Sequence, residues 1–292
     1  MRITSALLGS LAATAAKTLQ PSSSGADDWT NNSTKPIELV PAPWSLHGTV
    51  YSIASVLPPS DLPVKAYGPL ERSSSAYVAA AEYVGLLGMI QIIRYTDSPV
   101  GPYDELLMVP GYFKYPHVDE QGRRSERLNP SITRIYVSQK YTAKNGRMNW
   151  NIPKHLAKFV WADEADGSTT VKVYPHDTTP NDATESAPSA LPFFQTTFSP
   201  SSPPLPGNPD AAHGELAGTQ QWRAVVPGQA SDRSSLGMFD MGQGKSDAVG
   251  DTGKNAVGDE VFPNFWPGMP RLTLGLKMEN AKISFGEPEI WG

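Results

Sequence analysis

The residue types that carry most metal and covalent chemistry are sparse in this chain. It has 292 residues and no cysteine, which excludes disulfides, iron–sulfur clusters, thiolate zinc sites and cysteine nucleophiles. The five histidines stand at positions 47, 117, 155, 176 and 213, and no two have the His-x-x-x-His spacing of a helical zinc site. We therefore expect no bound metal.

The glycine-rich and acidic segments do not complete a nucleotide or calcium motif. Gly244-Lys245-Ser246 resembles the end of a P-loop, but Phe239 occupies the position of the earlier glycine that cradles phosphate. Asp247, Asp251 and Asp259 lack the alternate spacing of an EF-hand. The Gly-x-Gly-x-x-Gly and Gly-x-Ser-x-Gly motifs are absent, which disfavours dinucleotide folds and α/β-hydrolases. The expected chemistry uses no cofactor.

The charge balance argues against nucleic acid as a partner. Charged residues make up 18 % of the chain and the formal net charge is −5, whereas nucleic-acid affinity normally rests on an excess of Lys and Arg. Hydrophobic residues make up 39 %, enough for a sizeable core at this length. A hydrophobic small molecule is the expected partner.

Two segments stand out by their order and separation. Ser98–Leu107 (SPVGPYDELL) ends a strand–turn–strand unit, and Asn149–Ala157 (NWNIPKHLA) passes through a proline. Together they resemble the acetoacetate decarboxylase-like superfamily, in which a strand pair with a Gly-x-Tyr turn precedes a Pro-Lys-[Lys/His]-Leu segment. The resemblance covers Ile90–Trp161 well and the rest of the chain only by its density of strands.

The resemblance implies a set of catalytic residues. In decarboxylases of that family the first lysine of Pro-Lys-Lys forms a Schiff base with a β-keto acid, and this position is Lys154 here. Such an amine must be neutral near pH 7, which burial and a neighbouring cation achieve. The second lysine position is His155, a departure from the family pattern. Glu105 and Arg94 are the nearest candidates for the family's carboxylate and arginine partners.

Each candidate also has a structural interpretation. Lys154 fits the first turn of a surface helix that starts at Pro153, with His155 packed beneath it. Glu105 fits a strand-end carboxylate that accepts backbone or arginine hydrogen bonds. Five aromatic residues either line a substrate pocket or belong to the core: Tyr103, Tyr112, Tyr115, Trp150 and Trp161.

The elements that position these residues are predicted to be mostly strands. Glu105–Phe113 and Ile132–Lys140 have the composition and alternation of strands, and Tyr77–Tyr95 begins like a helix and ends like a buried strand. One helix is predicted after Pro153, because Leu156, Phe159 and Val160 have helical spacing.

The predicted fold is mainly β (α+β). We expect a closed or partly closed antiparallel β-barrel of the acetoacetate decarboxylase-like kind, with few helices and long loops, in a single domain over residues 46–292. Ser199–Asp210 is Pro-rich and Gly237–Glu260 is Gly- and Asp-rich, so both are predicted to be long surface loops and candidate lids.

The N-terminus has features of a secretory signal. Met1–Ala16 has one positive charge, a short apolar run and an Ala-x-Ala pattern, and it is too short to span a bilayer. Residues 17–45 read as a flexible arm with two overlapping sequons, at Asn31 and Asn32. We expect a protein of the secretory pathway with no membrane span.

Three functions remain open. The first is a cofactor-free enzyme of fungal-style specialised metabolism that steers cyclisation or a (hetero-)Diels–Alder-type addition of a polyketide- or terpenoid-like substrate. Tyr103, Trp150 and His155 are its hydrogen-bonding and stacking candidates. The second is a Schiff-base decarboxylase or retro-aldol lyase that uses Lys154. The third is a secreted small-molecule-binding protein without turnover.

Overall fold

The computed structural model describes residues 31, 34–57, 66–67, 82–119, 121–175, 192–201, 205–206, 228–241 and 272–287. The longer strands of this part of the chain are β1 (Trp44–Leu57), β2 (Glu82–Asp97), β3 (Tyr103–Val109), β4 (Tyr112–Val118), β5 (Arg124–Pro130), β7 (Lys154–Asp163), β8 (Thr169–Pro175), β9 (Phe194–Pro200), β12 (Arg233–Asp240) and β13 (Leu272–Phe285). The short strands are β6 (Arg134–Val137), β10 (Leu205–Pro206) and β11 (Gly228–Ala230). The helix is α3 (Lys140–Trp150).

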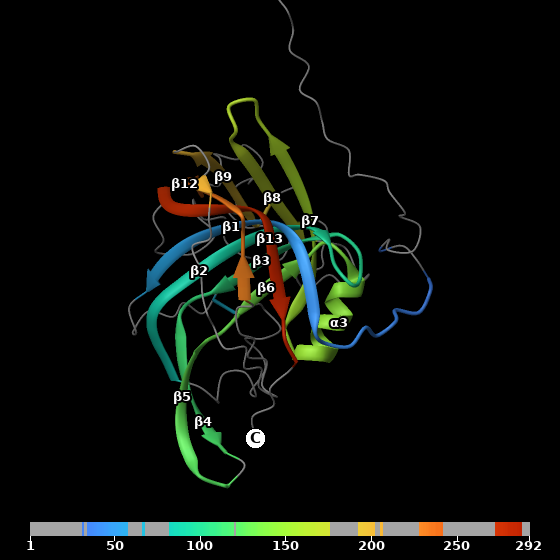
Figure 1. The fold of residues 1–292 in the computed structure, drawn as a ribbon, viewed down its shortest axis with the longest axis vertical. Coiled ribbons are helices and arrows are strands. Elements are labelled where there is room, and N and C mark those ends of the chain that lie inside the picture. Colours follow the sequence, from blue (N-terminus) through green and yellow to red (C-terminus); the bar gives the residue numbers. More distant parts are fainter. Residues whose placement is uncertain are drawn as a thin grey trace, which may run out of the picture.

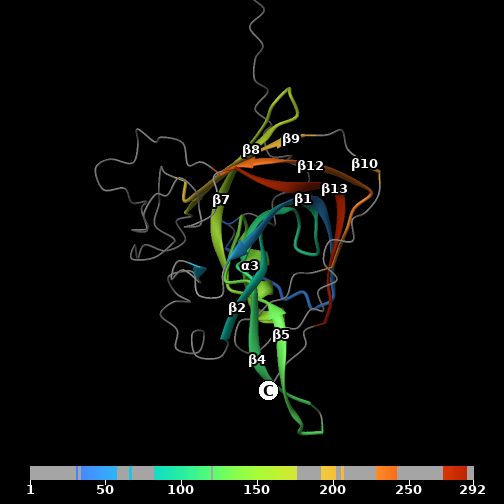
Figure 2. The ribbon, with the colours of Figure 1, turned by 90° about the vertical axis from the view of Figure 1, so that its left-hand side faces the viewer.

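Nine strands close into a barrel because β1 pairs with both β13 and β2 (Figure 1, Figure 2). Their order is β1-β13-β12-β9-β8-β7-β6-β3-β2, and within this ring only β6 and β7 run parallel. The β4–β5 hairpin continues from β2 and projects away from the barrel (Figure 1). The predicted mainly-β barrel is confirmed.

The strands bury side chains on both faces, and each face has its own core. Eight of the nine barrel strands contribute to one apolar cluster, which therefore lines the barrel interior and includes Tyr51, Tyr136, Val171, Phe194, Phe198 and Phe239. The second cluster lies on the opposite face of β1, β2, β3, β6 and β13 and packs against α3; we call this the helix-covered face. Its members include Trp44, Ile93, Tyr95, Tyr103, Tyr141, Trp150 and Phe285.

The helix predicted after Pro153 is wrong, and a strand stands in its place. The segment from Lys154 to Asp163 is β7, while the helix is α3, which lies just before the proline. Gln139 caps the start of α3, and Asn151 ends it in the left-handed conformation. Proline is common just after such a helix end because it cannot continue the helix, so Pro153 marks the end of a helix rather than its beginning.

Other predicted boundaries also differ from the structure. Of the predicted strand Ile132–Lys140 only β6 forms, because Lys140 already begins α3, and the predicted loop Ser199–Asp210 includes the end of β9 and all of β10. Glu105–Phe113 is divided between β3 and β4, because Pro110 and Gly111 form the corner between them. The predicted loop at Gly237 begins four residues too early, since β12 extends to Asp240. The signal segment Met1–Ala16 and most of both predicted long loops lie outside the described residues. No helix in the described part of the chain is long and apolar enough to cross a membrane.

Candidate active site

The helix-covered face contains a buried ion pair between Lys154 and Glu105. Lys154 Nζ lies 2.8 Å from Glu105 Oε2, and the two side chains are 3 % and 0 % exposed. Lys154 opens β7 and Glu105 lies in β3, with β6 between these strands. Burying two charges costs free energy unless both are well partnered. A buried ion pair of this kind therefore either stabilises the fold or belongs to a functional site.

Polar groups from β2 and α3 complete the surroundings of the pair. Thr142 Oγ1 lies 3.0 Å from the Lys154 amine, and the Tyr95 hydroxyl donates to Glu105 Oε1 at 3.1 Å. The Tyr103 ring centroid lies 5.2 Å from Lys154 Nζ, within the range of a cation–π contact. Both carboxylate oxygens and the amine are therefore partnered within the protein.

The Tyr103 hydroxyl is the group left unsatisfied beside this pair. It is buried and lies near Thr142 and Tyr95, but it completes a hydrogen bond with neither. Burial, aided by the Glu105 carboxylate, raises the pKa of Tyr95 and Tyr103 well above the usual value. Both hydroxyls are therefore protonated at neutral pH, and the Tyr103 hydroxyl is a donor that an incoming oxygen atom would satisfy.

The Lys154 side chain packs against helix α3. A Cβ atom at Gly146 would lie 2.7 Å from Lys154 Cδ and 2.8 Å from Cε, so the aliphatic stem of the lysine crosses the helix at this glycine. Arg147 fixes the same strand from the next helix position, because its Nε donates to the Lys154 carbonyl oxygen at 2.8 Å. The helix thus holds both the backbone and the side chain of Lys154.

The residue after Lys154 faces the other way. Successive side chains of a strand point to opposite faces, so the His155 ring lies on the barrel interior, with its centroid 6.2 Å from that of Tyr136. The structure therefore does not bring His155 beside the Lys154 amine, where the second lysine of the family pattern was expected to act on it.

Arg94 is likewise on the interior face, opposite to its neighbour Tyr95. Its guanidinium lies 5.3 Å from the Trp161 ring centroid, and Nη1 is 3.3 Å from Asp163 Oδ2. Glu105, the candidate carboxylate partner, lies next to Lys154, whereas Arg94, the candidate arginine partner, points into the barrel and away from both.

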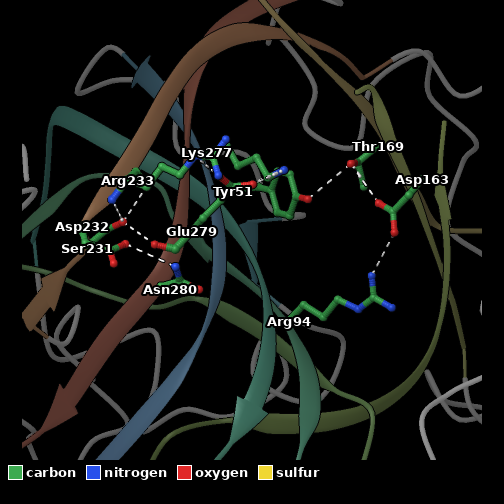
Figure 3. A network of polar contacts seen from close by, with 10 residues as sticks. All are labelled: Tyr51, Arg94, Asp163, Thr169, Ser231, Asp232, Arg233, Lys277, Glu279 and Asn280. Atoms are coloured by element: carbon green, nitrogen blue, oxygen red, sulfur yellow. Dashed lines mark hydrogen bonds and ion pairs between the residues drawn. The ribbon is translucent and has the colours of Figure 1, made fainter. Parts of the chain in front are cut away.

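Arg94 belongs to a set of interior polar and aromatic side chains that we call the interior layer. Its members are Tyr51, Arg94, Asp104, Trp161, Asp163, Thr169 and Lys277. Figure 3 shows the connected part: the Tyr51 hydroxyl lies 3.4 Å from Thr169 Oγ1, which donates to Asp163 Oδ1 at 3.0 Å, and Asp163 pairs with Arg94. The chain of contacts links β1, β8, β7 and β2 across one end of the barrel.

Asp104 is the titratable group of this layer with the most altered acidity. Burial raises its pKa from 3.8 to about 6, although the nearby Trp161 indole and the Arg94 guanidinium each act to lower it. Asp104 lies in β3 immediately before Glu105, so the two neighbouring carboxyls serve opposite faces of the barrel wall.

Lys277 is the amine of the interior layer. Burial alone would lower its pKa, but Tyr51 and Glu279 more than offset this and leave the pKa raised. Its Nζ lies 5.7 Å from the Tyr51 ring centroid and 3.0 Å from Glu279 Oε1 (Figure 3). Lys277 therefore remains an ammonium group at neutral pH.

The five predicted aromatic pocket residues do not gather at one place. Tyr103 and Trp150 lie on the helix-covered face, where the Trp150 indole donates to the Gly286 carbonyl and packs edge-on against Trp44. Trp161 lies in the interior layer. Tyr112 and Tyr115 belong to β4 of the projecting hairpin.

Of the two predicted glycosylation sites, Asn31 lies in the described part of the chain. Asn31 Nδ2 donates to the Ser138 carbonyl at 2.8 Å, and its Oδ1 accepts from the Lys140 backbone N–H at 2.8 Å. Its side-chain amide, the group that would carry a glycan, is thus engaged at the start of α3. Asn32 lies outside the described residues.

No group of three or more His, Asp or Glu side chains within the described ranges is arranged to hold a metal ion. On the helix-covered face Lys154 pairs with Glu105, and on the interior face Asp163 pairs with Arg94 and accepts from Thr169.

No protein-family model matches the sequence, and no curated protein matches it significantly. Among solved structures, the chain is similar to an acetoacetate decarboxylase from Legionella pneumophila at 13 % identity and a TM-score of 0.37, over 86 % of this chain and 92 % of that one. A second acetoacetate decarboxylase gives 11 % identity and a TM-score of 0.41, over 85 % and 89 % of the two chains.

A third similar structure is the enduracididine biosynthesis enzyme MppR, complexed with the condensation product of pyruvate and imidazole 4-carboxaldehyde. It has 13 % identity and a TM-score of 0.38, over 84 % of this chain and 87 % of that one. At such identities and TM-scores, roles for individual residues must come from the geometry of this chain.

The sequence reasoning missed several residues of both faces. Tyr95 and Thr142 contact the ion pair, and Asp104, Asp163 and Lys277 belong to the interior layer. The sequence does carry a signal for Tyr95 and Asp104, because they directly adjoin the candidates Arg94 and Glu105 in their strands. Thr142 had no such signal, because its helix was not predicted.

Proposed function

We propose that this protein is a cofactor-free enzyme of the acetoacetate decarboxylase-like kind that forms a Schiff base between Lys154 and a carbonyl substrate. The observation that carries the proposal is the buried contact of 2.8 Å between Lys154 Nζ and Glu105 Oε2, beside an unsatisfied Tyr103 hydroxyl. An amine, a carboxyl and a hydroxyl donor within one apolar setting are the groups that imine formation needs.

Glu105 supplies a route to the neutral amine that attack on a carbonyl requires. Transfer of a proton from Lys154 to Glu105 converts two buried charges into two neutral groups, in surroundings that penalise charge. This route needs no neighbouring cation, so the position of His155 on the other face is compatible with the proposal.

The proposed reaction begins with attack of the Lys154 nitrogen on the substrate carbonyl carbon, while the Tyr103 hydroxyl donates to the carbonyl oxygen. The attacking nitrogen passes one of its protons to that oxygen, protonated Glu105 adds a second, and the oxygen leaves as water, which gives an iminium ion. The bond from the α-carbon to a carboxylate or carbinol carbon then breaks, and its electron pair moves toward the iminium nitrogen. A carboxylate leaves as CO₂, whereas a carbinol gives its hydroxyl proton to the Glu105 carboxylate and leaves as an aldehyde. Protonation of the resulting enamine carbon and hydrolysis by water release the product.

Borohydride trapping tests the proposal. The full chain is incubated with acetoacetate, or with pyruvate and an aromatic aldehyde, and then reduced with sodium borohydride. We expect one covalent adduct, located at Lys154 by peptide mass spectrometry. Lys154→Arg keeps a cation opposite Glu105 and should give no adduct at this position, while Lys277→Arg should label like the parent. An unlabelled Lys154 under conditions that convert substrate would contradict the proposal.

A second candidate function is steered cyclisation or cycloaddition of a hydrophobic substrate, which needs shaped aromatic walls and hydrogen bonds rather than a nucleophile. The interior aromatic cluster favours this function. The Tyr51 ring centroid lies 5.7 Å from the centroids of both Trp161 and Phe198, and the Phe198 and Phe239 centroids lie 4.9 Å apart. Full turnover of a polyketide-like substrate by Lys154→Arg, without any borohydride adduct, would select this function over the first.

A further inference from the structure

We propose that the interior layer is a second binding site, separate from Lys154, for a neutral planar aromatic molecule that carries a carbonyl oxygen. The site lies at one end of the barrel, and its walls are Tyr51, Trp161 and Phe198. The mouths of β-barrels are common places for small-molecule sites. The proposal concerns the opposite face of the wall from the ion pair, so it does not depend on Schiff-base chemistry.

A buried donor marks the centre of the site. The Trp161 indole Nε1 is buried and forms no hydrogen bond of normal length and angle, and the Asp104 carboxyl, whose pKa the indole acts to lower, lies near it. Such a donor costs free energy when left unpaired in a protein interior, and a ligand oxygen that accepts from it would recover that loss. A carbonyl oxygen accepts hydrogen bonds and carries no charge that must be desolvated.

The aromatic side chains around the donor favour a planar ligand. Arg94 lies over the Trp161 ring at 5.3 Å, and Tyr51 meets the same ring at 5.7 Å with an interplanar angle of 36°. Phe198 packs edge-on against Tyr51, with an interplanar angle of 69°. Aromatic rings prefer offset or tilted contacts, so a planar aromatic ligand suits these surroundings.

The charges of the layer favour a neutral ligand over an ionic one. Arg94 is paired with Asp163 and Lys277 with Glu279, so both cations already have a carboxylate partner. Asp104 is largely ionised at neutral pH because its pKa is about 6, and it would repel an anion placed beside Trp161.

The layer is also reachable from water. The side chains of Arg94 and Asp163 are each 39 % exposed, while Tyr51 behind them is 6 % exposed. A ligand therefore has a charged, solvated rim at its entrance and an aromatic floor, which is the usual composition of a small-molecule site.

The test uses 6-propionyl-2-(dimethylamino)naphthalene, a planar aryl ketone whose emission shifts to shorter wavelength in apolar surroundings. Titration into the full chain at pH 7.5 should give a saturable, blue-shifted emission with one site per chain. Trp161→Phe keeps an aromatic wall and removes the N–H, so its dissociation constant should rise about fivefold, as for the loss of one hydrogen bond.

Val160→Thr is the matched control, because Val160 is the preceding residue of β7 and is 42 % exposed on the outer side. It should bind the probe like the parent, with thermal melting used to show that both variants are folded. Absence of saturable binding to the parent would overturn the proposal. Equal affinity of folded Trp161→Phe and the parent would overturn it as well.

Discussion

At three points in the barrel wall, consecutive residues of one strand divide between the two faces. Tyr95, Glu105 and Lys154 meet on the helix-covered face, while their neighbours Arg94, Asp104 and His155 face the interior. The strand period of two residues produces this separation without any special geometry. A motif such as Pro-Lys-His therefore contributes one residue to each face.

The acidity of Asp104 leads to a prediction about stability. Its pKa is about 6 in the folded protein and 3.8 ordinarily, so the folded state binds the proton more tightly and stability falls as the pH rises from about 4 to 6. Above pH 6 the ionised carboxyl costs about 3 kcal/mol. Asp104→Asn should therefore be more stable than the parent at pH 7.5 by up to about 3 kcal/mol, with the difference vanishing toward pH 4.

Urea unfolding of both proteins across that range measures the effect. A stability difference that is independent of pH, or that grows as the pH falls, would show that Asp104 does not carry this penalty.

The buried ion pair leads to a prediction from a double-mutant cycle. Lys154→Met leaves the Glu105 carboxylate buried without its cation and should lower the free energy of unfolding by about 3–5 kcal/mol. The double variant Lys154→Met/Glu105→Leu removes both charges and should lie within about 2 kcal/mol of the parent. Equal losses in the single and double variants would mean that the two groups are not coupled in solution.

At the scale of elements, the position of the lysine depends on the order helix, proline, strand. Asn151 ends α3 with φ 55°, Pro153 follows, and β7 starts at Lys154 beside β6. The sequence predicts a helix here because Leu156, Phe159 and Val160 satisfy a helical period. The structure instead uses the period of two through Ala157, Phe159 and Trp161, which line the interior.

The contact between α3 and the lysine stem predicts the effect of a small substitution. Gly146→Ala places a methyl group 2.7 Å from Lys154 Cδ and should push the amine away from Glu105. We expect borohydride trapping at Lys154 to slow at least about tenfold, the order expected when a reacting group is misplaced. Met148→Ala, at a helix position that is 61 % exposed, is the control and should trap at the parent rate.

At the scale of the whole molecule, barrel closure brings large rings close to backbone in the interior. A Cβ atom at Gly275 would collide with the Phe239 ring and with the Ser52 carbonyl of β1. Gly275→Ala should therefore lower the free energy of unfolding by about 1–3 kcal/mol through overpacking. Gly228→Ala meets no atom within 4 Å and should change the free energy of unfolding by less than about 0.5 kcal/mol. Urea unfolding of the two variants compares them directly.

The architecture was predictable from the sequence further than the site. Dense apolar and alternating segments indicate a mainly β fold. The resemblance carried by the Gly-x-Tyr turn and the Pro-Lys-His segment implies a barrel and makes Glu105 and Lys154 candidates. Strand register decides that Glu105 and Lys154 meet at 2.8 Å and that Arg94 faces the interior. The register of β2, β3 and β7 is set by pairing between strands far apart in the sequence. The residues of the interior layer come from strands as far apart in the sequence as β1 and β13, so no local sequence pattern predicts the layer.

The separation of two chemistries on the two faces of one barrel wall is tested most directly by a crystal structure of the borohydride-reduced adduct with acetoacetate. We expect new density continuous with Lys154 Nζ, between Glu105 and Thr142, with Arg94 still paired to Asp163 in the interior. An adduct on Lys277, or a Lys154 side chain turned into the barrel, would contradict the proposed separation.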